Sequence, residues 1–194
     1  GTYADANIKN FSHGIFQSVY DYPFLSSSAN HIFDLSAGYA TVSGLAEDAS
    51  VQNAKKINFY NEMAQILVGF DENSVIRRFD DDGDFVGTAT KINEAYFVSF
   101  ARLLTKDEIK KGSFTIELGT TVAHTGPFGG ASVSAGGIIQ ITDKSGSTGY
   151  KVNSPAGEYG ILYATGSDLD SAVVDGDGYA KAGLIYYQAG IAVL

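Results

Sequence analysis

The stretch DASVQNAKKINFYNEMAQILVGF, residues 48–70, is the longest run of the chain that follows a helical pattern. At about 100° per residue, its apolar side chains fall on one broad arc and most of its polar side chains fall opposite. Asp48 or Ser50 can accept the free amide hydrogens of the first turn, and Gly69 can take the left-handed conformation that ends a helix. The stretch therefore predicts one long amphipathic helix at about residues 48–68, stabilised mainly by packing of its apolar arc.

The polar residues of this helix raise two expectations. Asn53, Lys56 and Asn61 interrupt the apolar arc, so we expect the helix to pack against a partly polar partner. Lys55 and Lys56 are adjacent, and they belong either to a docking surface for another protein or to a solvated face. The pattern alone leaves both alternatives open.

The rest of the chain favours β-structure. Alternating or β-branched runs predict strands at residues 74–79, 85–90, 92–104, 113–118, 138–142, 159–164 and 184–194. For residues 92–104 a second helix is the alternative, and their β-branched and aromatic content favours the strand. The first two strands are expected to form a hairpin around the acidic residues 80–84. A capping box at residues 105–108, followed by Gly112, predicts a short helix at about residues 105–111. The expected fold class is therefore α+β, with mostly antiparallel strands in a sandwich or a barrel-like arrangement.

Residues 1–47 differ from the rest in composition, because aromatic side chains are spaced there by Ser, Asn and Gly. We expect an arm of short strands and turns that lies across another surface, with its aromatic residues as anchors. Residues 48–194 are expected to form a single α+β domain, whose C-terminal part from Gly119 onward is rich in Gly, Ser and Ala. No internal repeat or linker divides it further.

Composition argues against several functional classes. The 194 residues are 44% hydrophobic, which is typical of a globular chain. The net charge of −9 argues against nucleic-acid binding, where phosphate contacts need clustered Lys and Arg. The absence of Cys excludes disulfides, a thiolate nucleophile and Cys-ligated zinc. The longest apolar run, residues 182–194, is too short to span a bilayer, so no membrane partner is expected.

Two acidic clusters invite a calcium interpretation. Aligning Gly83 with the invariant glycine of an EF-hand loop places Arg78 at the first ligand position and leaves no Glu at the last. We therefore expect residues 80–84 to form a charged hairpin tip. A solvated loop is likewise favoured for the second cluster, which consists of Asp168, Asp170, Asp175 and Asp177. No metal or cofactor site is predicted.

Catalytic motifs are missing from the sequence as well. The histidines His13, His31 and His124 do not have the spacing of metal ligands. The segment around Ser132 lacks the final glycine of a nucleophile elbow, and the segment at Gly176 lacks the third glycine of a dinucleotide-binding loop. A pair of carboxylates for glycoside cleavage stays open, because its spacing is set only in three dimensions. The prediction is a protein that is not an enzyme.

Four stretches of the chain are similar to one known family. They are SVYDYPFLSSSANHIFDL at residues 18–35, QNAKKINFYNEMAQILVGFD at 52–71, FARLLTKDEIKKGSFTIEL at 100–118 and GLIYYQAGIAVL at 183–194. Together they resemble a virion structural protein of marine contractile-tailed bacteriophages, including cyanophages, from the tail or baseplate region. The similarity runs through most of the chain in matching order. Members of the family continue past the last stretch, which implies that this chain is a portion of a longer protein.

The resemblance implies a non-enzymatic virion subunit that assembles as a homo-oligomer, in contact with copies of itself and with other virion proteins. The residues that we expect at those contacts are Tyr20, Tyr22, Phe24 and Phe33 of the arm and Lys55, Lys56 and Tyr60 of the helix. A core role for each aromatic residue is equally open. Two other functions also remain open: an extracellular β domain that binds glycans or calcium, as an adhesin does, and a hydrolase that cleaves polysaccharides.

Overall fold

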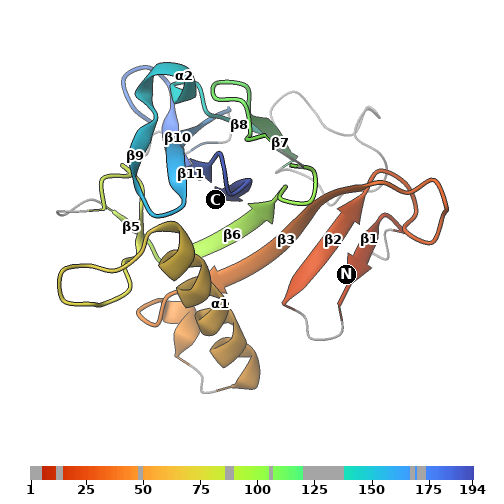
Figure 1. Ribbon diagram of the computed structural model, residues 1–194, viewed down its shortest axis with the longest axis horizontal. Helices are drawn as coiled ribbons and strands as arrows, with labels where there is room; N and C mark the ends of the chain where they lie inside the picture. The colour runs from red at the N-terminus through yellow and green to blue at the C-terminus, as the bar shows by residue number, and fades with distance from the viewer. Residues whose placement is uncertain are drawn as a thin grey trace.

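The computed structural model describes residues 6–11, 15–47, 50–85, 90–104, 107–119, 138–166, 169 and 174–194. Among them, α1 (Val51–Leu67) is the long helix, accompanied by a 3-10 turn, η1 (Gly44–Ala46), and a single helical turn, α2 (Gly146–Gly149) (Figure 1). The strands are β1 (Ile8–Asn10), β2 (Phe16–Tyr20), β3 (His31–Tyr39), β4 (Phe79–Asp80), β5 (Lys91–Ile92), β6 (Glu94–Ser99), β7 (Thr115–Gly119), β8 (Ile138–Thr142), β9 (Lys151–Ser154), β10 (Gly157–Thr165), β11 (Ala180–Tyr186) and β12 (Ile191–Val193). All these strands pair antiparallel, so the predicted α+β class is confirmed.

Ten of the strands form one sheet in the order β1-β2-β3-β6-β12-β11-β10-β8-β7, with β9 paired to β10 beside that path. Strands β4 and β5 make a separate two-stranded hairpin. The sheet twists strongly, so that β3 and β10 run in different directions in Figure 1. The sequence left open whether the strands form a sandwich or a barrel. The structure has one twisted sheet, whose strand order begins at β1 and ends at β7.

A hydrophobic core lies on each face of this sheet. Successive side chains of a strand point to opposite sides, so the same strands contribute to both cores. On β11, Leu184 and Tyr186 pack into a core that contains α1, whereas Ile185 packs into a second core on the other face. The buried residues of the first, the helix-side core, are Ala40, Tyr60, Ala64, Leu67, Val68, Phe79, Phe85, Ala95, Phe97, Tyr159, Leu184, Tyr186 and Val193. Those of the second, the far-side core, are Val98, Phe114, Ile141, Leu162, Ala164, Ile185, Tyr187 and Ala192.

Helix α1 begins and ends where the local sequence predicts. The Ser50 hydroxyl accepts a hydrogen bond from the backbone N–H of Asn53 at 3.2 Å, which caps the first turn. At the other end, Gly69 has a φ of +81° and donates its N–H to the carbonyl oxygen of Ala64 at 3.0 Å. The central helix is therefore confirmed, while Asp48, the alternative cap, lies outside the described residues.

The helix lies directly on β3, and Gly38 permits the close approach. A Cβ atom at this position would lie 3.0 Å from the carbonyl oxygen of Lys56 and 3.0 Å from the backbone nitrogen of Tyr60. These are backbone atoms, which cannot rotate away as the end of a flexible side chain can. Next to this contact, Tyr39 donates a hydrogen bond from its hydroxyl to Asn53 at 2.5 Å, so the helix meets a partly polar surface as expected.

An aromatic group fills the space between α1 and the sheet. Tyr60 meets Phe79 edge to face with ring centroids 5.5 Å apart, and Phe79 lies 5.7 Å from Phe97. The Tyr60 hydroxyl donates a hydrogen bond to the backbone carbonyl oxygen of Ile92, so its polar end is also satisfied. Burial of these three rings stabilises the helix on the sheet far more than helix propensity does.

The short helix predicted at residues 105–111 is wrong over its described part, residues 107–111, and the first two residues of the range lie outside the described chain. Ile109 instead donates its backbone N–H to the carbonyl oxygen of Tyr187 at 3.0 Å. Its side chain packs against the far-side core. These contacts with a residue distant in sequence replace the local capping pattern.

A buried carboxylate completes this loop. Asp143 is 1% exposed and accepts hydrogen bonds from the backbone N–H groups of Gly112 at 2.6 Å and Phe114 at 2.8 Å. The hydroxyl of Tyr187 donates to the same carboxylate at 3.1 Å. Asp143 therefore satisfies backbone donors where this loop leads into β7.

Two strand predictions need correction. The single strand expected at residues 184–194 is a hairpin, in which β11 and β12 are joined by a turn that ends at Gly190 with a φ of +67°. The hairpin expected around the acidic residues 80–84 is present, but its paired residues belong to β4 and β5. Of the expected strand at residues 85–90, residues 86–89 lie outside the described chain.

Gly38→Ala should destabilise the fold. The added methyl group forces α1 away from β3, and overpacking of this kind costs about 1–3 kcal/mol. Gly44→Ala is the matched control, because a Cβ at Gly44 meets nothing within 4 Å. Its free energy of unfolding should change by less than about 0.5 kcal/mol. Urea unfolding followed by circular dichroism measures both variants, and equal stabilities would contradict the close approach at Gly38.

Candidate functional site

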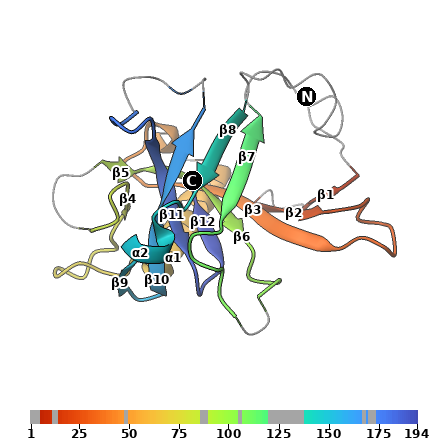
Figure 2. The same ribbon diagram turned by 90° about the horizontal axis from the view of Figure 1, so that it is seen from above.

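Strands β1 and β2, with the loop of residues 21–30 that leads into β3, extend the sheet to one side of the molecule (Figure 2). We call this segment, residues 6–11 and 15–30, the N-terminal wing. None of its described residues belongs to the helix-side core or to the far-side core. Strand β3, in contrast, pairs with β6 along six consecutive residues. The wing is the part of the predicted arm, residues 1–47, that projects from the rest of the sheet.

The loop of the wing is held by local hydrogen bonds. The Asp21 carboxylate accepts one from the backbone N–H of Asn30 at 2.7 Å and one from its side-chain amide at 2.9 Å. These hydrogen bonds from Asn30 favour the ionised carboxylate and lower the pKa of Asp21. On this loop, Tyr22 and Leu25 are 59% and 88% exposed. The wing thus presents two large apolar side chains to solvent on a fixed support.

The aromatic residues predicted at an interface are placed in different environments. Tyr22 is exposed on the loop of the wing. Tyr20 is partly buried, with its ring edge-on to His31 at 5.6 Å and 6.4 Å from the ring of Phe24. Phe33 packs against the margin of the far-side core. Tyr22 is therefore the residue of the four best placed to meet another protein, and the others support the wing from within the chain.

At the root of the wing, Asp34 joins three partners. Its carboxylate accepts a hydrogen bond from the Ser18 hydroxyl at 2.5 Å, lies 2.9 Å from Nε2 of His31, and forms an ion pair with Arg102 at 3.0 Å. Burial of Asp34 opposes ionisation, but the hydrogen bonds from Ser18 and His31 and the charge of Arg102 outweigh it, so the pKa of Asp34 is lowered. The cluster ties β2 to β3 and to the segment after β6, which fixes the direction of the wing.

A groove of about 170 Å³ lies where the wing meets the helix, and we call it the wing groove. Its walls include Phe11 and Phe16, whose rings stack 4.2 Å apart, together with Leu35 and Tyr96. Tyr96 is 59% exposed. Lys56 of α1 also lines the groove, and burial lowers the pKa of its ammonium group. The wing groove is therefore an aromatic surface with a partly desolvated positive charge beside it.

Of the helix residues predicted at an interface, Lys56 reaches this groove. Lys55 is partly exposed on the helix surface. Tyr60 is 1% exposed, and its ring is enclosed by Phe79 and Phe97 in the helix-side core. Its placement corrects the prediction that Tyr60 lies at an interface, because a partner of the folded chain cannot reach that side chain.

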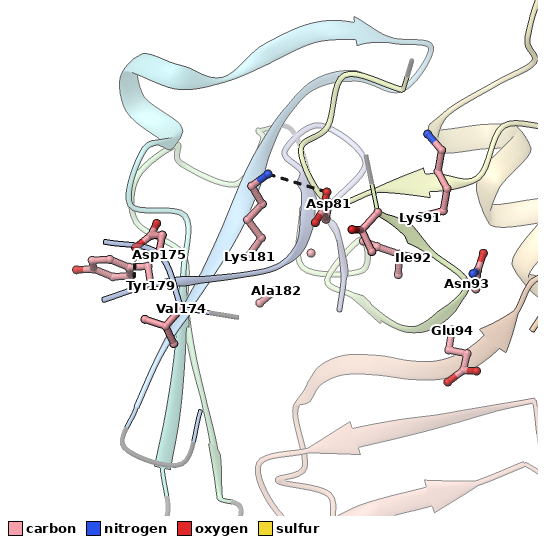
Figure 3. A pocket seen from close by; sticks show the side chains of 12 residues that line it. Asp81, Lys91, Ile92, Asn93, Glu94, Val174, Asp175, Tyr179, Lys181 and Ala182 are labelled. Carbon is pink, nitrogen blue, oxygen red and sulfur yellow. Dashed lines mark hydrogen bonds and ion pairs between the residues drawn. The ribbon is translucent and has the colours of Figure 1, made fainter. Parts of the chain in front are cut away.

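A larger hollow of about 760 Å³ lies beside the β4–β5 hairpin (Figure 3). Figure 3 shows Asp175 and Tyr179 on one side of it and side chains of β5 on the other. Asp81 forms an ion pair with Lys181 at 4.0 Å. The Asp175 carboxylate accepts the backbone N–H groups of Tyr179 at 2.9 Å and Asp177 at 3.0 Å, and the bond from Tyr179 contributes most to lowering the pKa of Asp175. A lowered pKa is the opposite of what a general acid needs.

The tip of the β4–β5 hairpin carries the group of described residues that can bind a metal ion. One carboxylate oxygen from each of Asp80, Asp82 and Asp84 lies within 4.8 Å of the other two. Asp80 is fully buried and forms an ion pair with Lys91. Residues 80–84 are therefore a more compact acidic cluster than the solvated hairpin tip that the sequence suggests.

The remaining predicted site residues add no further group. Among the described residues His31 is the histidine, and its ring nitrogen faces Asp34. The other candidates lie outside the described residues: His13, His124, Ser132, Asp168 and Asp170.

Comparison with known proteins gives no relative. No protein-family model matches the chain, and no curated protein and no solved structure gives a significant match. Within the part of the chain that the structure describes, no helix is both long enough and apolar enough to cross a membrane.

Asp34→Asn should weaken the fold at neutral pH by about 1 kcal/mol, because hydrogen bonds and an ion pair to a carboxylate are lost. The pKa of Asp34 is lower in the folded than in the unfolded chain, so its contribution is present above the unfolded pKa, near 3.9, and is lost as the pH falls below it. The difference in Tm between wild type and variant should therefore shrink between about pH 4 and pH 2. Thermal unfolding followed by circular dichroism measures it, and a difference that stays constant over this range would contradict the assignment.

Proposed function

We propose that this chain is a non-enzymatic structural subunit of a virion, in the tail or baseplate region of a contractile-tailed bacteriophage. In this role it acts through contacts with copies of itself and with other virion proteins. The resemblance of four sequence stretches suggests the class of particle. The observation that carries the role of an assembly subunit is the N-terminal wing, which extends the sheet beyond both cores and exposes apolar side chains.

The wing combines the features of a protein-binding anchor. Tyr22 and Leu25 project from a loop that hydrogen bonds hold in one conformation. A pre-ordered loop loses little conformational entropy on binding, so more of the burial energy appears as affinity. Aromatic side chains are also enriched among the residues that dominate interface energy.

The wing groove suits a partner segment that is apolar and acidic. Phe11, Phe16 and Tyr96 offer aromatic surface, and Lys56 offers a positive charge beside it. Burial lowers the pKa of Lys56, and a carboxylate of a partner placed against it restores the preference for the charged form. The chain itself carries a net charge of −9, so copies of it are rich in such carboxylates.

The edges of the sheet offer a second mode of contact. Strands β1 and β7 end the sheet, and among the described residues neither is paired on its outer side. Backbone N–H and C=O groups on such edges can pair with a strand of another chain. Edge pairing through β1 would place a partner strand next to the exposed wing.

The hollow in Figure 3 is less suited to the alternative of a glycan-binding domain. Sugar rings stack on exposed aromatic faces, and Tyr179 is an aromatic residue of that hollow. The ammonium group of Lys144, however, lies 3.2 Å from the centroid of the Tyr179 ring, and Tyr163 approaches the ring edge-on at 6.4 Å. A cation already occupies one face that a sugar needs.

Substitution of the wing tip tests the proposal. In particles produced from the genome that encodes the chain, quantitative mass spectrometry should detect the wild-type protein in purified virions. The double variant Tyr22→Ser/Leu25→Ser should be incorporated about tenfold less, because loss of an interface anchor costs more than about 1.4 kcal/mol.

Val152→Ser is the matched control, because Val152 is 68% exposed on β9, away from the wing. It should be incorporated like the wild type. Absence of the wild-type chain from the particles would overturn the proposed function. Normal incorporation of the double variant would overturn the role of the wing.

A further inference from the structure

We propose that Asp80, Asp82 and Asp84 form a calcium-binding site at the tip of the β4–β5 hairpin. One carboxylate oxygen of each residue lies within 4.8 Å of the other two. Three negative charges this close repel one another unless a cation or protons balance them. A set of oxygen ligands alone is what Ca²⁺ prefers, whereas zinc sites are built mostly from His and Cys. The site is independent of the assembly role proposed above.

The environment of Asp80 is a second observation that points to a ligand. Its side chain is fully buried at the end of β4. Oδ2 of Asp80 pairs with the ammonium group of Lys91, but Oδ1 is buried without a hydrogen-bond partner. A buried carboxylate oxygen without a partner is costly and uncommon in native proteins. A cation bound between the three carboxylates supplies the missing partner.

The spacing of the three acids agrees with that of a calcium loop. Asp80, Asp82 and Asp84 match the first, third and fifth positions, whose side chains turn toward one ion. The sixth position is normally Gly, because the backbone there takes a left-handed conformation. Here it is Phe85, which has a φ of +62°. An EF-hand alignment that places Gly83 at the sixth position starts at Arg78. The alignment that fits Asp80, Asp82 and Asp84 starts two residues later, at Asp80.

The affinity should be weaker than that of an EF-hand. The twelfth position is Lys91, which takes the place of a bidentate Glu and neutralises part of the acidic charge. With Lys91 in place of that Glu, the expected Kd lies in the range of extracellular calcium modules, about 10⁻⁴–10⁻³ M.

Calcium binding should stabilise the whole fold, because the hairpin tip is bonded to the main sheet. The hydroxyl of Tyr159 on β10 donates to the carbonyl oxygen of Gly83 at 2.5 Å. The side-chain amide of Asn153 on β9 donates to the carbonyl oxygen of Asp84 at 3.4 Å. A ligand that binds only this folded arrangement shifts the unfolding equilibrium by mass action.

Thermal unfolding in calcium tests the site. The purified chain, freed of metal with a chelator and dialysed, should gain Tm in CaCl₂, with an approximately tenfold shift of the unfolding equilibrium at ten times the Kd. MgCl₂ at equal concentration should give a smaller gain, because Mg²⁺ demands stricter octahedral geometry. No change of Tm up to about 10 mM CaCl₂ would overturn the proposal, as that is about ten times the weakest Kd expected. An equal gain in MgCl₂ would overturn the assignment to calcium.

The variant Asp82→Asn/Asp84→Asn should abolish the gain while leaving the buried Asp80 intact. Glu72→Gln/Asp177→Asn is the matched control, because it removes the same charge at exposed positions outside the site. The control should retain the wild-type gain in CaCl₂. A gain that persists in the Asp82/Asp84 variant would overturn the location of the site.

Terbium luminescence gives a readout that does not depend on unfolding. Tb³⁺ takes oxygen ligands like Ca²⁺ and is excited through a nearby tyrosine, here Tyr159, whose hydroxyl is bonded to the hairpin tip. Emission should rise on addition of TbCl₃ to the wild type and fall on addition of CaCl₂. Emission that is unchanged in the Asp82→Asn/Asp84→Asn variant would overturn the site.

Discussion

The backbone of α1 rests on β3 at Gly38, where a side chain would collide with the carbonyl oxygen of Lys56 and the backbone nitrogen of Tyr60. This close approach brings the Tyr60 ring within contact of Phe79 and Phe97, so the helix-side core forms around it. Because the side chains of the same strands alternate, the far-side core is built on the opposite face. The helix thus sets the position of the central strands, and the second core holds them from the other side.

The two cores also define what remains outside them. The N-terminal wing shares the sheet's hydrogen bonds but none of its buried apolar clusters. The Asp34 cluster holds the wing against β3, and Asp21 holds its loop. Polar contacts therefore stabilise the wing, whereas apolar packing stabilises the rest of the sheet. A segment built in this way keeps its shape while leaving large apolar side chains such as Leu25 in solvent. That combination suits a docking element more than it suits a structural part of the domain.

Features whose causes are local were predictable from the sequence. The ends of α1 follow from Ser50 and Gly69, which act within one turn of themselves. The short helix was mispredicted because Asp143 and Tyr187, which hold the segment as a loop, lie far away in sequence. For the same reason, the amphipathic pattern of α1 does not predict whether Tyr60 is buried in the core of the chain or contacts another protein.

Hydrogen–deuterium exchange on the chain, free and within assembled particles, tests the central claim most directly. Amides of β6, β10 and β11 should be equally protected in both states, because these strands contribute to cores that form within the single chain. Amides of the N-terminal wing should exchange more slowly in the particle than in the free chain. Equal exchange of the wing in the two states, or new protection confined to the central strands, would contradict the account.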